Sequence, residues 1–397
     1  MAKSFSTKKY LSKLFAPQLL SELATKHGTQ MFFEINDQTP RKLAVSLMED
    51  SIKALDTEPR LEILKDLSYL ASITSAHTAS LGKKLFKEQT KKDFEPEIEC
   101  VSDHDVVLYI FLRHEEIADK LAFLFPFYAS KSYISYEAKK VEQLDAEVKL
   151  TELTREFTRL ANKDDNATEQ EMEHLFLNDI LYIESKFQGS YDVENKVDAK
   201  TGEINRKHVS RKIETVRIAY LPKEETVLIA GNVSKEQKII FLDTFLRIVC
   251  GGGYEEKIEV YNLLPLKNLS LDFTQHNKGT PFIKATIKSV TVSYEEGKKK
   301  LRLTLPSSND HTGMQALKET LGELGLEERF SSFDIVNMTF GFMFQNKEKQ
   351  DKAVNVSCSI SPSRASLCPL FEYERYTKAI LKNAGVYEGW KVRQEEK

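Results

Sequence analysis

The stretch ETVRIAYLPKEETVLIAGN, residues 214–232, places two runs of apolar and β-branched residues on either side of a turn that begins at Pro222. Short runs of this kind, bounded by Pro, Gly and Asn, predict β-strands. A turn of four residues brings the chain back alongside itself, so we expect the two strands to pair as an antiparallel hairpin. This hairpin predicts an antiparallel sheet in the second half of the chain.

The same pattern recurs on both sides of that hairpin. Two further strand pairs are predicted, 281–294 with 299–306 and 333–346 with 353–362, together with single strands at 179–189 and 257–266. Strands joined mainly by hairpins, with few helices between them, favour a largely antiparallel sheet over a doubly wound parallel one. We therefore predict an α+β domain over residues 175–397, with a mostly antiparallel sheet and a few packed helices.

The first part of the chain has helical periodicity instead. Ser102 and Asp105 stand in capping-box spacing before an apolar helical face, and the helix that they begin is expected to end at Pro126. The acidic stretch 163–174 marks the change from the helical period to alternation. We predict an all-helical domain over residues 1–165, and an α+β protein overall.

Length and composition limit the class of protein. A chain of 397 residues is too long for one ordinary domain. Its 57 basic and 60 acidic residues give a formal net charge of -3, which excludes nucleic-acid binding through bulk charge. No apolar run is long enough for a membrane span, so no membrane partner is expected. Cys100, Cys250, Cys358 and Cys368 lie far apart, which indicates reduced thiols in a cytoplasm and neither a zinc site nor a disulfide framework.

Three consecutive glycines, Gly251 to Gly253, raise the question of a phosphate-binding loop. Such a loop places its glycines before a helix, where backbone N–H groups and the positive end of the helix dipole face the anion. Here the glycines follow a segment with one apolar helical face, residues 235–250. We interpret them as the end of that helix.

One candidate for catalysis is a Glu-x-Lys motif, Glu184 and Lys186, on the predicted strand 179–189. In metal-dependent nucleases such a pair lies beside a further acidic residue; the carboxylates hold Mg²⁺ and the lysine orients or stabilises the attacking water. Glu173 and Asp179 lie upstream, on what is predicted as the preceding helix. Side chains alternate between the two faces of a strand, so charged residues on an exposed face also give a Glu-x-Lys sequence that has no catalytic role.

A histidine beside two glutamates, His114, does not form a zinc-protease motif. The motif HExxH requires a second histidine, and position 118 is an alanine. We interpret His114 as a histidine packed on an apolar helix face. Apart from Mg²⁺ in the nuclease interpretation, no metal or cofactor is expected.

Two basic clusters beside predicted hairpin turns are the candidates for nucleic-acid binding. Phosphate contacts need exposed cations on rigid strands. The first cluster is Arg206, Lys207, Arg211 and Lys212, and the second is Lys298, Lys299, Lys300 and Arg302. Lysines at hairpin tips and strand edges also prevent edge-to-edge pairing of sheets, which is the alternative explanation.

No GxSxG elbow or other concentrated catalytic signature is present. The sequence therefore indicates an intracellular interaction protein more than an enzyme. We expect an adaptor or sensor subunit of a larger assembly, in a prokaryotic defence or stress system. The expected partners are another protein and, through the basic hairpins, nucleic acid. A metal-dependent nuclease that uses Glu184 and Lys186 is the alternative.

Overall fold

The computed structural model describes residues 5–36, 38–130, 133–141, 146–161, 171–197, 204–294, 299–305, 314–347 and 353–392. For residues 146–148, 189–197 and 204–212 it describes the backbone but not the side chains. The chain divides into two compact units, Met1–Lys131 and Ser132–Lys397. The division falls before the predicted boundary at 165–175, because β1 and α8 share a core with the strands of unit 2.

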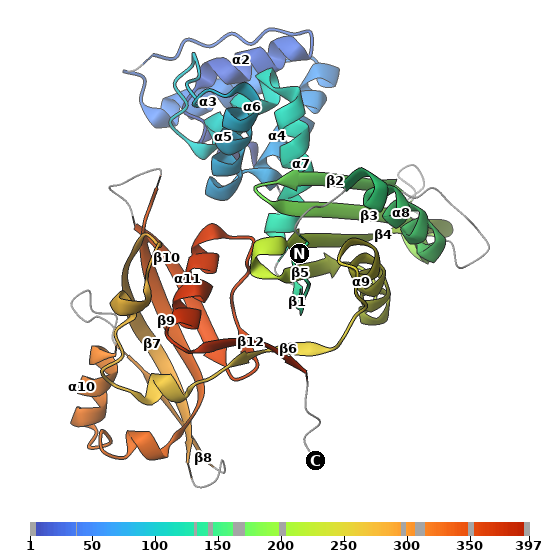
Figure 1. Cartoon of the computed structure of the whole chain (residues 1–397). Helices are drawn as coiled ribbons and strands as arrows, with labels where there is room; N and C mark the ends of the chain where they lie inside the picture. Colours follow the sequence, from blue (N-terminus) through green and yellow to red (C-terminus); the bar gives the residue numbers. More distant parts are fainter. Residues whose placement is uncertain are drawn as a thin grey trace. The chain divides into compact units, whose positions relative to one another are not determined.

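Unit 1 contains helices and loops in its described part (Figure 1). Leucines and isoleucines at helical spacing form its core, such as Ile63, Leu67 and Leu70 of α4. Burial of one apolar stripe per helix is what makes these short helices stable. The helices are α1 (Thr7–Leu11), α2 (Pro17–Lys26), α3 (Arg41–Lys53), α4 (Thr57–Ile73), α5 (Ala76–Thr90), α6 (Asp103–Arg113) and α7 (Glu115–Ala129).

The predicted capping box at the start of α6 is confirmed. Ser102 Oγ accepts a hydrogen bond from the Asp105 N–H at 3.1 Å, and Asp105 Oδ2 accepts one from the Ser102 N–H at 2.8 Å. Asp105 Oδ1 also accepts hydrogen bonds from the backbone N–H groups of Phe15 at 2.8 Å and Ala16 at 3.0 Å. The carboxylate is fully buried. It therefore ties the segment between α1 and α2 to the start of α6.

The helix predicted to run from Ser102 to Pro126 is in fact two helices. Helix α6 ends at Arg113, and His114 follows with φ -138° and ψ 70° before α7 begins. Helix α7 contains Pro126 and continues to Ala129, so the prediction that the helix ends at this proline is wrong. A proline costs a helix one hydrogen bond and a steric clash. Here the fully buried Phe127 anchors the last turn in the core.

The first sheet of unit 2 has, among the described residues, five antiparallel strands in the order β1-β5-β4-β3-β2. Strands β4 and β5 form the predicted hairpin around a short helical turn, η1 (Pro222–Glu224). Helices α8 and α9 pack on one face of the sheet (Figure 1). The elements are β1 (Ile134–Glu137), α8 (Ala146–Ala161), β2 (Glu171–Leu177), β3 (Ile180–Val197), β4 (Ile204–Leu221), β5 (Thr226–Gly231) and α9 (Lys235–Val249).

Helix α9 ends at the three glycines, as predicted. Gly251 has φ +68°, and the Gly252 N–H donates to the Leu246 carbonyl oxygen at 3.2 Å. A left-handed residue followed by such a bond is typical of a helix C-terminus. The glycines therefore end a helix and do not begin one.

Gly231, at the end of β5, lies where there is no room for a Cβ atom. Its φ is +145°, and a Cβ atom there would lie 2.1 Å from the carbonyl oxygen of Thr215. The next residue, Asn232, accepts a hydrogen bond from the Thr215 N–H at 2.6 Å and donates one to the Ile213 carbonyl oxygen at 3.0 Å. This close approach joins the end of β5 to β4.

Gly231→Ala is expected to lower the free energy of unfolding by about 3 kcal/mol, because the backbone clash adds to the cost of an unfavourable φ. Urea unfolding of the purified variant measures this loss. Gly279 provides the matched control, since it also has positive φ, +75°, but nothing within 4 Å of a Cβ. Gly279→Ala is expected to cost about 1 kcal/mol. Equal losses in the two variants would contradict the role of the close approach.

The second sheet of unit 2 has, among the described residues, five antiparallel strands in the order β11-β10-β9-β7-β8, and β6 pairs with β12 in a small sheet of its own. Both predicted hairpins, β7–β8 and β9–β10, are confirmed. Phe340, Phe342 and Phe344 face a core that α10 and α11 share. The strands and helices are β6 (Lys257–Tyr261), β7 (Phe282–Tyr294), β8 (Lys299–Thr304), α10 (Gln315–Glu323), β9 (Asp334–Gln345), β10 (Ala353–Ser361), β11 (Arg364–Ala365), α11 (Glu372–Asn383) and β12 (Tyr387–Val392), with short helical turns η2 (Leu264–Lys267), η3 (Phe273–His276) and η4 (Phe330–Ser332).

The predicted α+β class, with antiparallel sheets, is confirmed. In the part of the chain that the structure describes, no helix has both the length and the apolar character needed to cross a membrane.

Candidate nucleic-acid interface

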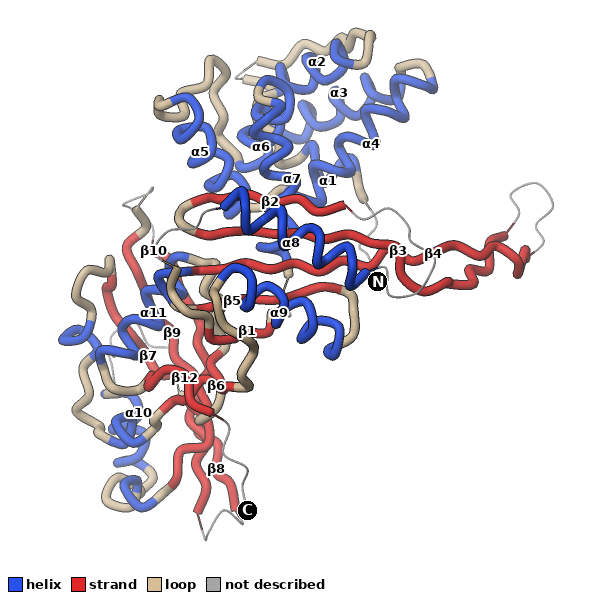
Figure 2. The backbone as a smooth tube through the Cα atoms, turned by 45° about the vertical axis from the view of Figure 1, so that its right-hand side comes forward, coloured by secondary structure: helices blue, strands red, loops and turns tan. Residues whose placement is uncertain are grey.

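Strands β3 and β4 extend well beyond the sheet to which they belong. Strand β2 pairs with β3 only at residues 180–186, and β5 pairs with β4 only at residues 216–221. Beyond Gln188 and Ile213, the described strands β3 and β4 pair only with each other. They form a two-stranded ribbon that leaves the sheet (Figure 2). At about ten residues per strand, the ribbon is about 30 Å long.

The first basic cluster lies on this ribbon. Its members Arg206, Lys207, Arg211 and Lys212 stand on β4, although their side chains lie outside the described part. With Lys196 of β3, the paired segments 188–197 and 204–213 carry five basic residues against the two acids Asp192 and Glu194. The ribbon therefore has a net positive charge in a protein whose total charge is negative.

Irregularities in the pairing shape the ribbon. The register shifts between Gln188 and Tyr191 and again between Glu194 and Lys196. Such bulges increase the right-handed twist of a two-stranded ribbon. The major groove of DNA admits a two-stranded ribbon, and cations along its length can contact the phosphates on either side.

The second basic cluster lies on β8, at the edge of the second sheet. Lys299, Lys300 and Arg302 are exposed, whereas Lys298 lies outside the described residues. Lys299 Nζ lies 6.0 Å from the centre of the Tyr294 ring. The structure does not bring the two basic clusters together on one sheet, because β8 belongs to the second sheet and the ribbon to the first.

The residues of the nuclease interpretation meet on the first sheet. Glu173 lies on β2, directly opposite Glu184 of β3, so the prediction that Glu173 belongs to a helix is wrong. The signal that identifies β2 is the dipeptide Asn178-Asp179, whose φ angles are 53° and 62°. Two residues with positive φ form the type I′ turn that favours hairpins, and Asn and Asp tolerate it well.

The carboxylate of Glu184 is held by two cations. Its side chain is 5% exposed, and its Oε2 accepts a hydrogen bond from Arg217 Nε at 2.5 Å while its Oε1 lies 3.0 Å from Lys186 Nζ. Burial lowers the pKa of Lys186, but the hydrogen bond and charge of Glu184 and the charges of Glu173 and Glu171 outweigh it, so the pKa is raised. A lysine held in its charged form can stabilise an anion but cannot act as a general base at neutral pH.

This set of donors does not fit a resident Mg²⁺ ion. Both oxygens of Glu184 already face cations, and Asp179 is paired with Lys223 at 2.5 Å. Within the described ranges, no group of three or more His, Cys, Asp or Glu side chains could hold a metal ion. A magnesium site needs carboxylate oxygens that do not already face cations. The cluster is, in its geometry, an ion-pair network around one buried carboxylate, that of Glu184.

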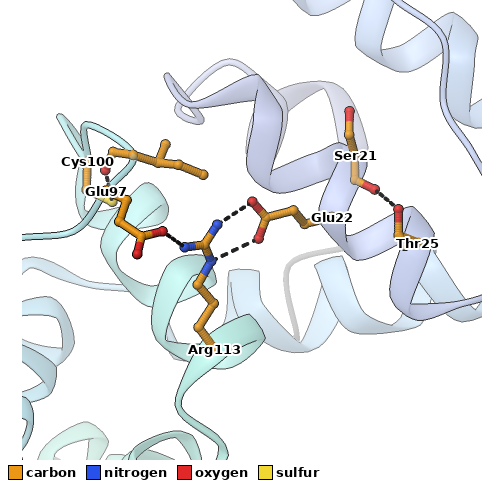
Figure 3. Close-up of polar contacts among 7 residues, drawn as sticks. Ser21, Glu22, Thr25, Glu97, Cys100 and Arg113 are labelled. Atoms are coloured by element: carbon orange, nitrogen blue, oxygen red, sulfur yellow. Dashed lines mark hydrogen bonds and ion pairs between the residues drawn. The ribbon is translucent and has the colours of Figure 1, made fainter.

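Arg113 of unit 1 is an ionic centre for which the sequence contains no signal (Figure 3). Its Nε and Nη2 donate to the two carboxylate oxygens of Glu22 at 3.1 and 2.7 Å, and its Nη1 donates to Glu97 at 2.7 Å. A free guanidinium could bind phosphate in the same bidentate way. Here it joins α2 to the loop that precedes α6, so its role in the described structure is to hold that loop.

His114 agrees with its interpretation as a packed histidine. Its ring lies 5.0 Å from the Phe86 ring and 5.8 Å from the Tyr109 ring. Burial, and then the charge of Arg113, lower its pKa. The imidazole is therefore neutral at pH 7 and packs as an apolar group.

Comparison with known proteins adds no functional information. No family model matches the sequence, and a search of curated proteins finds no significant match. The case for a function therefore depends on the geometry and charge of this chain.

Proposed function

We propose that the protein is an interaction protein, an adaptor or sensor subunit of a larger assembly, that contacts nucleic acid through the basic hairpins of unit 2. The observation that carries the proposal is the β3–β4 ribbon, which leaves its sheet and bears five basic residues against two acids. A cytoplasmic location is part of the proposal. The four cysteines, all without a disulfide partner, support it.

The shape of the ribbon supports nucleic acid more than edge protection as the reason for its charge. Charges of either sign and bulges protect unpaired strand edges, whereas five of the seven Asp, Glu, Lys and Arg residues of the ribbon are basic. In the ribbon the two strands pair only with each other, and ordering it costs conformational entropy. Contacts between the basic residues of the ribbon and a nucleic acid would give the ribbon a function.

The binding test is a fluorescence-anisotropy titration of the purified protein with duplex and single-stranded DNA and RNA at several salt concentrations. We expect binding that weakens as salt rises. The slope of log K against log salt is negative, and each phosphate that a cation neutralises adds about 0.9 to its magnitude. In the variant with Gln at Arg206, Lys207, Arg211 and Lys212, this magnitude is expected to be smaller by about 4.

A matched control removes positive charges elsewhere in unit 2. The triple variant Lys235→Gln, Lys238→Gln and Arg247→Gln changes α9, which lies on one face of the first sheet. It is expected to retain the slope of the original protein. The absence of binding at low salt, or equal losses in the control, would contradict the proposal.

A metal-dependent nuclease is the weaker second candidate. The register places Glu173 opposite Glu184, but both oxygens of Glu184 face cations, so a metal ion would have to displace one of them. The same titration, repeated with Mg²⁺ or Mn²⁺ and followed by gel analysis, tests it. Glu173 is exposed, so Glu173→Gln leaves the buried ion pairs intact. Metal-dependent cleavage that Glu173→Gln abolishes would support the nuclease. Intact nucleic acid under all conditions would exclude it.

A further inference from the structure

The second sheet of unit 2 has an inner face in the core and an opposite face that is polar. Val290, Phe340 and Cys358 lie in the core with α10 and α11. Side chains alternate along a strand, so the residues between these core positions form the opposite face. Lys288, Arg302 and further residues of that face are exposed.

Strand register aligns the residues of the opposite face in rows that cross the sheet. The rows are Arg302, Thr291 and Asn337; Thr304, Ser289, Thr339 and Ser359; and Thr286, Gly341 and Ser357. Apart from the glycine, each member carries a hydroxyl, an amide or a positive charge. We call these residues, together with Lys288 and Lys300, the polar face. Its exposed members are Lys288, Lys300, Arg302, Thr304 and Ser357, whereas Ser289 is buried.

The charge of the polar face is almost entirely positive. Lys288, Lys300 and Arg302 belong to it, and Lys284 stands opposite Met343 at its end. Among the described positions of this face the one acid is Asp334, which lies 3.6 Å from Lys267. Solvated faces of folded proteins usually mix both signs. The polar face therefore has a surplus of cations that solubility does not require.

Lys288 is the member of this surplus that edge protection does not explain, since Lys300 and Arg302 lie on the edge strand β8. Its Nζ lies 3.3 Å from Ser357 Oγ on β10, so the side chain crosses β9, which lies between β7 and β10. A Cβ atom on Gly341 of β9 would lie 2.8 Å from Lys288 Cε. The glycine thus leaves room for the lysine to pass. The ammonium group stands over an interior strand, where no edge needs protection.

Hydroxyl and amide groups are held in place beside the cations. Ser359 Oγ donates to Asn337 Oδ1 at 3.0 Å and lies 3.2 Å from Thr339 Oγ1. Ser, Thr, Asn, Lys and Arg side chains are among those that donate hydrogen bonds to phosphate oxygens in protein–DNA complexes. The polar face combines all five.

We propose that the polar face binds the sugar–phosphate backbone of a nucleic-acid duplex; this inference rests on the proposed function and extends the site of the β8 hairpin across the sheet to Lys288 and the rows of hydroxyls. The rows of the polar face contain no aromatic residue, so they offer no platform on which the bases of a single strand can stack. Cations and hydroxyls on the outer face of a sheet suit a duplex, whose phosphates are outermost.

The test compares the binding of duplex DNA by three variants. The variant Lys288→Gln, Lys300→Gln and Arg302→Gln is expected to reduce the magnitude of the slope of log K against log salt by about 3. Gly341→Ala keeps the net charge but displaces the Lys288 side chain, and it is expected to reduce the magnitude of the slope by about 1. The α9 triple variant is expected to bind like the original protein. Thermal unfolding checks that all variants are folded.

The results separate this inference from the proposed function. If the polar-face triple variant binds duplex like the original protein while the ribbon variant loses binding, the polar face is not a site and the proposed function stands for the ribbon alone. Equal losses in the α9 variant would show a bulk charge effect and overturn the inference. If the original protein binds no nucleic acid, the inference and the proposed function both fail.

Discussion

Replacement of Asp105 by alanine is expected to lower the free energy of unfolding of unit 1 by about 4 kcal/mol. The buried carboxylate accepts hydrogen bonds from the N–H groups of Phe15, Ala16 and Ser102 at 2.8, 3.0 and 2.8 Å. Bonds to a charged acceptor are about twice as strong as neutral ones. In the alanine variant these three N–H groups lose their acceptor. Each one left without a hydrogen-bond partner away from water lowers the free energy of unfolding by its desolvation penalty.

Urea unfolding followed by far-UV circular dichroism measures this loss, because the helices of unit 1 contribute strongly to that signal. The single tryptophan, Trp390, lies in unit 2 and its fluorescence follows that unit. Asp103→Ala is the matched control, since Asp103 belongs to the same first turn of α6. The Asp103→Ala variant loses only the favourable interaction of an acidic side chain with the N-terminal end of the helix dipole, which is expected to lower the free energy of unfolding by at most about 1 kcal/mol. Equal losses at the two positions would disprove the role assigned to Asp105.

Replacement of Arg217 by methionine is expected to destabilise unit 2 by about 3 kcal/mol, because it leaves the carboxylate of Glu184 buried with one cation in place of two. The Glu184 side chain is 5% exposed and the Arg217 side chain 23%. The remaining partner, Lys186, is 36% exposed, so water screens part of its charge. The free energy of unfolding from urea titrations, followed by Trp390 fluorescence, measures the change.

The double variant Glu184→Met and Arg217→Met separates the two possible causes of that loss. If the cost is that of an uncompensated buried charge, removal of the charge with its partner restores most of the stability. If the cause is instead the missing packing of the arginine, the double variant remains as unstable as the single one. The second result would refute the ion-pair explanation.

The hairpins of unit 2 can be predicted because each depends on residues close in sequence. The turn at Pro222 and the strands on either side of it lie within residues 214–232. Strand β2 escapes prediction for the opposite reason. Its sequence EMEHLFL does not alternate, and pairing with β3 through the turn at Asn178 and Asp179 makes it a strand. Tertiary pairing overrides weak local preference in such segments.

The basic clusters are visible in the sequence as charge, but their geometry is not. The lengths over which β2 and β5 pair with the ribbon strands decide where the ribbon begins, and register is a property of the sheet. Lys288 has no distinguishing signal in the sequence, because the alternation of β7 suggests only an outward lysine. That it crosses β9 depends on a glycine in another strand.

Contacts between near neighbours, such as the capping box of Ser102 and Asp105 and the end of α9 at Gly251, can be read from the sequence. Their hydrogen bonds close within a turn or two of backbone, so residue type and spacing suffice. The contacts of Asp105 with Phe15, and of Glu184 with Arg217, join residues 90 and 33 positions apart. They exist only once the chain has folded, because packing of whole helices and pairing of whole strands bring these groups together.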